Sequence, residues 1–166
     1  TVLRFITSDN QVVERTIIAT STLAGGLVTD TQVTLLNADL PGSVSFVKVL
    51  PVNSHEFLPT IMSTSLPAIA FDQQEKAIAR KITRMFGGTV SSDNYISGPF
   101  SSLSETIIPG DSGNPVFFVI AGEAVLISIW TYVTSGPDLR TLQSQINAAM
   151  TSLGGGYQLT EIDLSG

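Results

Sequence analysis

The chain has 166 residues, enough for one domain of ordinary size or two small β-barrels, and 43% of them are hydrophobic, enough for a buried core. Only 13% are charged and the net charge is -6 at pH 7, so we expect no nucleic-acid partner, because phosphate binding needs clustered Lys and Arg. The absence of cysteine excludes disulfides, thiolate metal sites and a Cys nucleophile, and no apolar run is long enough for a membrane span.

The first residue is Thr1 rather than Met, which indicates a processed or excised piece of a longer polypeptide. The N-terminus lacks the basic and apolar regions of a signal peptide. A chain of this size can be stable without disulfides, so the lack of cysteine is compatible with the secreted or extracellular location that we expect.

The first part of the chain, residues 1–52, predicts strands. Segments 2–6 and 11–18 are apolar and flank a turn-forming Ser-Asp-Asn sequence, which predicts a β-hairpin. A Gly-Gly pair then interrupts the chain, and residues 30–36 form an alternating segment that predicts a third strand. A further strand is expected at 44–52, where the apolar run ends near a proline.

Residues 53–66 predict a linker, because they combine Ser and Pro without a regular apolar period. The second part, residues 67–166, begins with further expected strands at 67–72, 77–82 and 95–98. The plainest hairpin of the chain is predicted where the apolar segments 116–120 and 124–130 flank Ala-Gly-Glu.

An amphipathic helix is predicted near the C-terminus, because apolar residues recur every three or four positions from Leu139 to Leu153. Three glycines, beginning with Gly154, end this pattern. The tail from Tyr157 to Leu164 continues beyond the helix and carries no functional motif.

The sequence Gly110-Asp111-Ser112-Gly113-Asn114-Pro115 runs directly into the predicted strand 116–120. Glycines on both sides of Ser112 let the backbone turn tightly and let a substrate carbonyl come close. The N–H groups of Gly110 and Ser112 can donate to a developing oxyanion, and one such donor contributes about 3 kcal/mol to transition-state binding. The alternative is an ordinary turn, since Asp, Ser and Gly are common turn residues.

These six residues resemble the nucleophile motif of the trypsin-like serine peptidases, which have the chymotrypsin fold and usually carry Gly-Asp-Ser-Gly-Gly-Pro. Asn114 replaces the second of the paired glycines, at a position that provides no oxyanion donor. The resemblance implies an all-β protein of two six-stranded antiparallel barrels with a C-terminal helix. The first barrel is incomplete and spans 1–52, and the second spans 67–166. A strand is also implied within 73–86, although the composition of that segment allows a helix.

The resemblance further implies that Ser112 is the nucleophile and that Asp30 orients a catalytic histidine. In this family the triad Asp lies just ahead of a strand with apolar residues at its fourth and seventh positions, and Val33 and Leu36 fit that pattern. The alternative for Asp30 is an exposed turn residue.

Four further residues are assigned to a substrate pocket by the same resemblance. Ser128 and Trp130 resemble, with an offset of one residue, the Ser-Trp-Gly strand that lines the primary specificity pocket. Thr106, six residues before Ser112, corresponds to the pocket base, and Gly136 lies near one wall. A neutral Thr offers no counter-charge, so the pocket is expected to prefer an uncharged side chain. The alternative for Thr106 is an ordinary loop residue.

The catalytic histidine of the family has no counterpart in this chain. It normally precedes the triad Asp by roughly 45 residues, whereas only 29 residues precede Asp30 here. We therefore expect a separate preceding polypeptide, held without a disulfide, to supply the histidine and two strands. The chain alone should be nearly inert, because losing the nucleophile or its base costs on the order of 10⁶ in kcat.

The only histidine, His55, lies in the expected linker. The order Asp30, His55, Ser112 is that of subtilisin-like enzymes, but the sequence around Ser112 is not theirs, which favours a linker role for His55.

The sequence thus predicts a serine endopeptidase that acts on peptides or proteins without cofactor or metal. The alternatives are an inactive trypsin-like fold used as a binding or structural module, and a hydrolase that uses His55.

Overall fold

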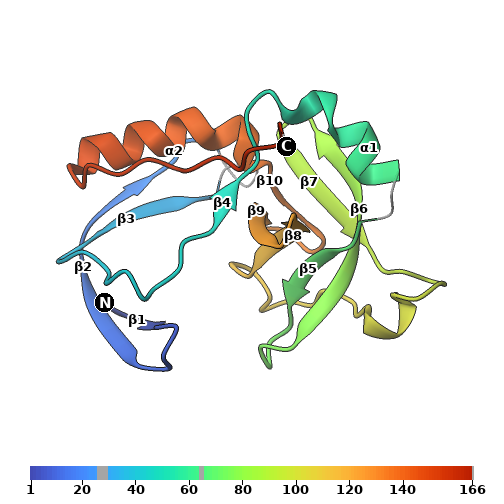
Figure 1. Ribbon diagram of the computed structural model, residues 1–166, viewed down its shortest axis with the longest axis horizontal. Coiled ribbons are helices and arrows are strands. Elements are labelled where there is room, and N and C mark those ends of the chain that lie inside the picture. Colours follow the sequence, from blue (N-terminus) through green and yellow to red (C-terminus); the bar gives the residue numbers. More distant parts are fainter. Residues whose placement is uncertain (26–29, 64–65, 166) are drawn as a thin grey trace.

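The computed structural model describes residues 1–25, 30–63 and 66–165. Within these ranges the chain forms a three-stranded sheet and a seven-stranded sheet, with helix α2 lying over the smaller one (Figure 1). The structure is mostly β with a C-terminal helix, as predicted from the sequence.

The small sheet has the strand order β1-β2-β3 and is antiparallel throughout. Its strands are β1 (Val2–Ile6), β2 (Val12–Thr22) and β3 (Gln32–Leu36). The predicted first hairpin is confirmed: Thr7 N donates to Gln11 O at 2.9 Å, and Asn10 takes the left-handed conformation at φ 60° that the turn requires. Side chains along β1 and β2 alternate between exposed and half-buried, and no side chain in the three strands is fully buried.

The large sheet has the order β10-β7-β6-β5-β8-β9-β4. Its strands are β4 (Lys48–Val49), β5 (Ala68–Phe71), β6 (Ala77–Phe86), β7 (Thr89–Asp93), β8 (Pro115–Ile120), β9 (Glu123–Ile129) and β10 (Ser135–Pro137). Strands β5, β6 and β7 follow one another as antiparallel neighbours, and β8 returns after a long connection to lie beside β5. This order is a Greek key.

Two expectations within the large sheet are confirmed. The segment 73–86 contains a strand, β6, rather than a helix. Strands β8 and β9 form the predicted hairpin. Its turn residues Ala121 and Gly122 both have positive φ angles, 51° and 78°, as a two-residue turn of type I′ requires.

The strand expected at 44–52 is wrong in extent and in partner. Only β4 forms, and it pairs in parallel with β9 instead of joining the small sheet. The backbone of Val49 bonds the C-terminal tail on its other side, because its N–H donates to Thr160 O and its C=O accepts from Ile162 N, both at 2.9 Å. A long-range contact with the tail therefore decides where this strand lies.

The strand expected at 95–98 is also wrong, since β7 ends at Asp93. The ring of Tyr95 packs against Phe100 with centroids 5.3 Å apart, and Tyr95 N donates to Ser104 Oγ instead of a neighbouring strand. Gly98 turns the chain at φ 82°. The segment expected as a linker includes two short helices, η2 (Ser54–Glu56) and α1 (Leu58–Ser63).

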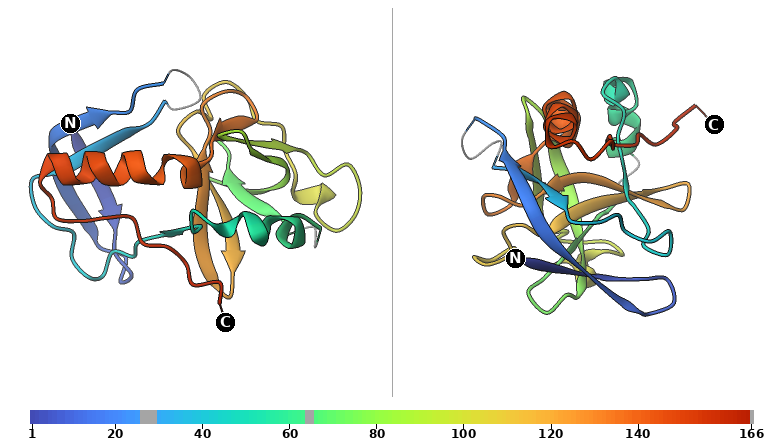
Figure 2. Two further views of the ribbon diagram at one scale, coloured as in Figure 1. Left: turned by 90° about the horizontal axis from the view of Figure 1, so that it is seen from above. Right: turned by 90° about the vertical axis from the view of Figure 1, so that its left-hand side faces the viewer.

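The predicted C-terminal helix is confirmed as α2 (Leu139–Leu153). The side chain of Asp138 caps its N-terminus, and Gly154 ends it in the left-handed conformation at φ 83°. The helix buries Leu139, Leu142 and Ile146 against apolar side chains from both sheets. Figure 2 shows α2 along the small sheet and the tail running back from it toward β4.

The main core lies within the large sheet and includes Phe118 and Trp130, each 1% exposed. The two barrels of chymotrypsin type that we expected, the first incomplete and the second complete, are not confirmed, because the structure shows no closed barrel. Within the described residues the edge strands β10 and β4 are not paired with each other, and the small sheet has three strands. A closed barrel requires an unbroken circle of paired strands.

Candidate active site

Residues 108–114, which we name the Ser112 turn, lead from a loop into β8. Ser112 is exposed, whereas the preceding Asp111 is 2% exposed. The turn is held against the end of β9, because Gly113 N donates to Trp130 O at 2.8 Å and Trp130 N donates to Asn114 O at 3.0 Å. Core packing of Trp130 therefore fixes the position of Ser112.

The backbone N–H groups of the Ser112 turn divide into two sets. Those of Asp111, Gly113 and Asn114 donate to carbonyls of the protein, and that of Ile108 donates to the carboxylate of Asp111, so these four are paired. Those of Gly110 and Ser112 have no acceptor among the described residues. Unpaired N–H groups on an exposed turn are available to an external acceptor. They are the two groups that the sequence motif predicted as oxyanion donors.

Side chains from the neighbouring segment hold the Ser112 turn from the other side. Asn114 Nδ2 donates to Phe71 O at 2.9 Å, and Gln73 Nε2 donates to Pro109 O at 2.8 Å. Gly110 has φ 106°, and a Cβ there would lie 2.6 Å from Gln73 Nε2. The positive φ therefore favours glycine at 110, and any larger residue would also have to displace the side chain of Gln73. Sequence reasoning missed Gln73, since no local pattern links it to a residue 37 positions away.

The buried carboxylate of Asp111 supports the same turn. Its Oδ2 accepts from Ile108 N at 2.8 Å, which closes the loop around Pro109 and Gly110. Its Oδ1 is buried and has no hydrogen-bond partner among the described residues.

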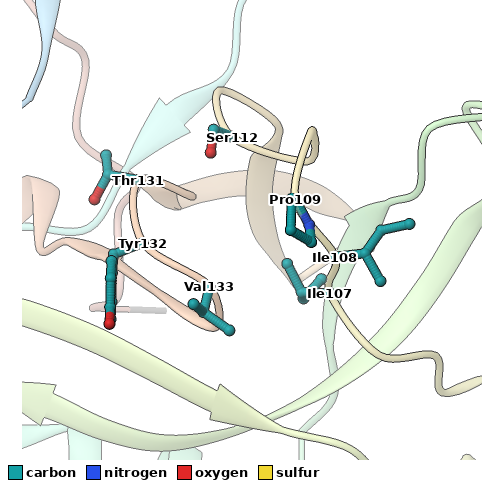
Figure 3. A pocket seen from close by; sticks show the side chains of 7 residues that line it. All are labelled: Ile107, Ile108, Pro109, Ser112, Thr131, Tyr132 and Val133. Carbon is teal, nitrogen blue, oxygen red and sulfur yellow. The ribbon is translucent and has the colours of Figure 1, made fainter.

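Ser112 borders a pocket of about 210 Å³ (Figure 3). Residues 107–109 form one side, residues 131–133 form the other, and Ser112 lies at the rim between them. The lining residues are Ile107, Ile108, Pro109, Ser112, Thr131, Tyr132 and Val133. None of them carries a charge. Of these residues only Ser112 was predicted from the sequence. Two others, Ile107 and Thr131, directly follow Thr106 and Trp130, which were assigned to the pocket by resemblance.

The four residues assigned to the pocket from the sequence are not among these lining residues. Thr106 is exposed, and its Oγ1 accepts from Asn94 Nδ2 at 3.0 Å. Ser128, Trp130 and Gly136 are buried, and Gly136 lies against the side chain of Ser128. Ser128 Oγ donates to Pro137 O at 2.8 Å, and a Cβ on Gly136 would lie 2.1 Å from Ile129 O.

A buried guanidinium fixes the loop that leads into the Ser112 turn. Arg80 is 1% exposed, and burial lowers its pKa from the ordinary value. It donates to Ser92 Oγ at 3.1 Å, to Glu105 O at 2.7 Å and to the side chain of Asn94. The bond to Glu105 O ties the loop before the Ser112 turn to β6.

The remaining candidates do not contact Ser112 in the described part of the chain. Asp30 is exposed at the entry to β3, with no ion pair or hydrogen bond to another described residue. His55 is exposed in η2, and no described contact joins it to Ser112 or Asp30. Ser112 Oγ itself has no hydrogen-bond partner among the described residues.

The described residues lack two further features. They contain no group of three or more His, Cys, Asp or Glu side chains that could hold a metal ion. None of their helices is long and apolar enough to cross a membrane.

No protein-family model, no curated protein and no solved structure matches this chain. A functional assignment therefore depends on the geometry of the Ser112 turn and its pocket.

Proposed function

We propose that this chain carries the nucleophile of a serine endopeptidase that cleaves peptide bonds by acyl transfer. The observation that carries the proposal is the combination on one turn of an exposed Ser112 with two unpaired N–H groups, those of Gly110 and Ser112. An oxyanion hole needs such donors held before the reaction begins, and the hydrogen bonds that anchor the Ser112 turn support this role.

In this reaction Ser112 Oγ attacks the carbonyl carbon of the scissile peptide bond, and its proton passes to the imidazole of a histidine. The negative charge that forms on the carbonyl oxygen accepts hydrogen bonds from Gly110 N and Ser112 N. The carbon–nitrogen bond then breaks, and the imidazolium gives its proton to the leaving amine. Water then attacks the resulting ester of Ser112 and gives its proton to the histidine. The ester bond breaks, and the imidazolium returns the proton to Ser112 Oγ.

The strand order supports a trypsin-like arrangement for residues 67–166. Strands β5 to β10 are six in number. Strand β10 lies at one end of the strand order, yet it also contacts β9, which lies next to last at the other end. Ser128 Oγ on β9 donates to Pro137 O on β10, and Thr131 N donates to Ser135 O at 3.1 Å. We propose that these six strands correspond to the second barrel of that fold.

The histidine of this mechanism would come from a separate polypeptide, and Asp30 would orient it. Two features of the small sheet support such a partner. Among the described residues β1 pairs only with β2, so one edge of β1 is unpaired. Phe5, Val13 and Ile17 are only half-buried on one face, while Val2 and Ile18 on the other are 54% and 59% exposed. Strands added at β1 would cover apolar surface and supply the missing base.

A second candidate is a binding or structural module with the same fold and no activity. It is favoured by the absence of any described contact between a histidine and Ser112.

A fluorophosphonate probe, applied to the protein purified from its native source, separates the two candidates. The enzyme requires covalent labelling that disappears in Ser112→Ala and persists in Ser102→Ala, a matched change at another exposed serine. Asp30→Asn should slow labelling by roughly 10⁴. Absence of labelling in the native protein would contradict peptidase function and support the binding module.

The same assay tests the proposed origin of the base. The 166-residue chain alone should label slower by on the order of 10⁶, and His55→Ala should leave labelling of the native protein unchanged. Full labelling of the isolated chain that is lost in His55→Ala would instead identify His55 as the base.

A further inference from the structure

The pocket beside Ser112 has apolar walls made by Ile107, Ile108, Pro109 and Val133. Ile107 is 4% exposed and belongs to the main core, so this wall is anchored, while Ile108 is 51% exposed and faces solvent as well. The pocket volume of about 210 Å³ is below the roughly 300–1,000 Å³ of sites for drug-sized ligands. It suits a single side chain rather than a larger molecule.

Val133 occupies a strained position in the opposite wall. It lies at the tip of a tight turn in which Ser135 N donates to Tyr132 O at 2.8 Å, and its φ is 44°. A β-branched residue is unfavourable in this left-handed region, where glycine is the usual choice. The side chain is also 57% exposed, so burial does not compensate for the strain. Strain of this kind is typical of residues that serve a site.

We propose that the pocket selects peptides with an uncharged aliphatic side chain at the residue whose carbonyl Ser112 attacks, and that Val133 determines this selectivity. The inference depends on the proposed function, because it gives the substrate of the same serine. Its physical basis is that the pocket lining is mostly apolar and offers no counter-charge, so a Lys or Arg side chain would lose hydration without gaining an ion pair. An aliphatic side chain gains by leaving water.

Binding can be measured without catalysis, by following the methyl NMR signals of Ile107, Ile108 and Val133 in the full chain. The probes are N-acetyl-leucine amide, N-acetyl-lysine amide and N-acetyl-glycine amide. The leucine compound should bind at least roughly tenfold more tightly than either of the others, which is the usual value of one or more buried methylenes. Equal binding of the three compounds, preference for lysine, or shifts confined to other methyl groups would overturn the proposal.

Two variants test the roles of the walls. Val133→Gly removes the aliphatic wall and should reduce the leucine-to-glycine ratio several-fold. Ile108→Asp adds a carboxylate at an exposed position and should reverse the ranking toward lysine, while the control Leu103→Asp, at a comparably exposed residue outside the pocket, should not. Unchanged ratios in both Val133→Gly and Ile108→Asp would overturn the assignment.

Failure of this inference can be distinguished from failure of the proposed peptidase function. Selective binding without labelling of the native protein would remove the peptidase function and leave an aliphatic binding pocket, which contradicts the substrate part of this inference. Labelling of Ser112 without selective binding would leave the peptidase function and remove the aliphatic specificity.

Discussion

The two sheets of this protein bury their apolar residues to very different degrees. The large sheet surrounds a core of side chains such as Val90, Val116 and Val125, each fully buried. The small sheet contributes no residue to that core, and its strands contain no fully buried side chain. Burial of apolar surface is the main stabilising contribution in folding. The large sheet can therefore stabilise itself, whereas the small sheet depends on what packs against it.

In the described structure, helix α2 packs against the small sheet. Leu142 and Ile146 pack on Leu23 and Val33, and Leu126 of the large sheet joins the same cluster. The Ser112 turn lies on the self-sufficient large sheet, and Asp30 lies on the dependent small sheet. In a peptidase this division would make assembly of the triad sensitive to anything that stabilises the small sheet.

The largest expected effect is a loss of core packing in the large sheet. Phe118→Ala should lower the free energy of unfolding by about 3–5 kcal/mol, because it opens a cavity at a fully buried ring. The matched change Phe5→Ala, at a half-buried ring of the small sheet, should cost only about 1 kcal/mol. Urea denaturation followed by circular dichroism measures both. Similar losses in the two variants would show that the sheets are equally well packed.

Substitutions of Asp138 test how α2 is attached to the large sheet. Its buried carboxylate caps the helix and accepts from Arg140 Nη2 at 2.5 Å, while its N–H donates to Gly88 O at 2.9 Å. Asp138→Ala should cost about 3 kcal/mol, since it leaves a mostly buried guanidinium without its carboxylate. Asp138→Asn retains the cap and should cost less in thermal or urea unfolding. If Asp138→Asn is as stable as the unchanged chain, the charge of Asp138 has no part in the attachment. Equal losses in the two variants would leave no contribution for the cap.

Ile146 tests whether the small sheet depends on α2. Ile146→Ala should cost about 2–3 kcal/mol of local stability, and amide hydrogen exchange in β2 and β3 should become roughly 30-fold faster or more, with little change in β5 and β8. Gln145→Ala, on the exposed face of the same helix, is the control. Uniform acceleration across both sheets would mean that the two unfold as one unit.

The smallest expected effect is an increase in stability. Val133→Gly should raise the free energy of unfolding by about 1 kcal/mol, because glycine relieves the strain of a positive φ. Val119→Gly, at an exposed valine within β8, should instead destabilise the protein by about 1 kcal/mol. A loss of stability in Val133→Gly would contradict the assignment of strain to that residue.

Local patterns were sufficient for several parts of the fold. The hairpins around Asn10 and Gly122 follow from turn residues that accept positive φ between alternating segments. Helix α2 follows from its apolar period and from Gly154. The Ser112 turn and its two candidate donors were also apparent from six consecutive residues, because glycine spacing constrains the backbone directly.

Contacts between distant segments decided the rest. The parallel pairing of β4 with β9, the bonds of Val49 to the tail, and the approach of Gln73 to Gly110 all join residues that no local period relates. The pocket beside Ser112 is not lined by Ser128 and Trp130, which were assigned to it by resemblance, because both are buried in the core. The turn at Val133 forms one of its walls. By itself the sequence determined the two hairpins, helix α2 and the Ser112 turn, since these depend on backbone dihedral angles and apolar periods of neighbouring residues. Only the tertiary structure decided which strands pair and which side chains face the pocket, since these depend on how the whole chain buries its apolar surface.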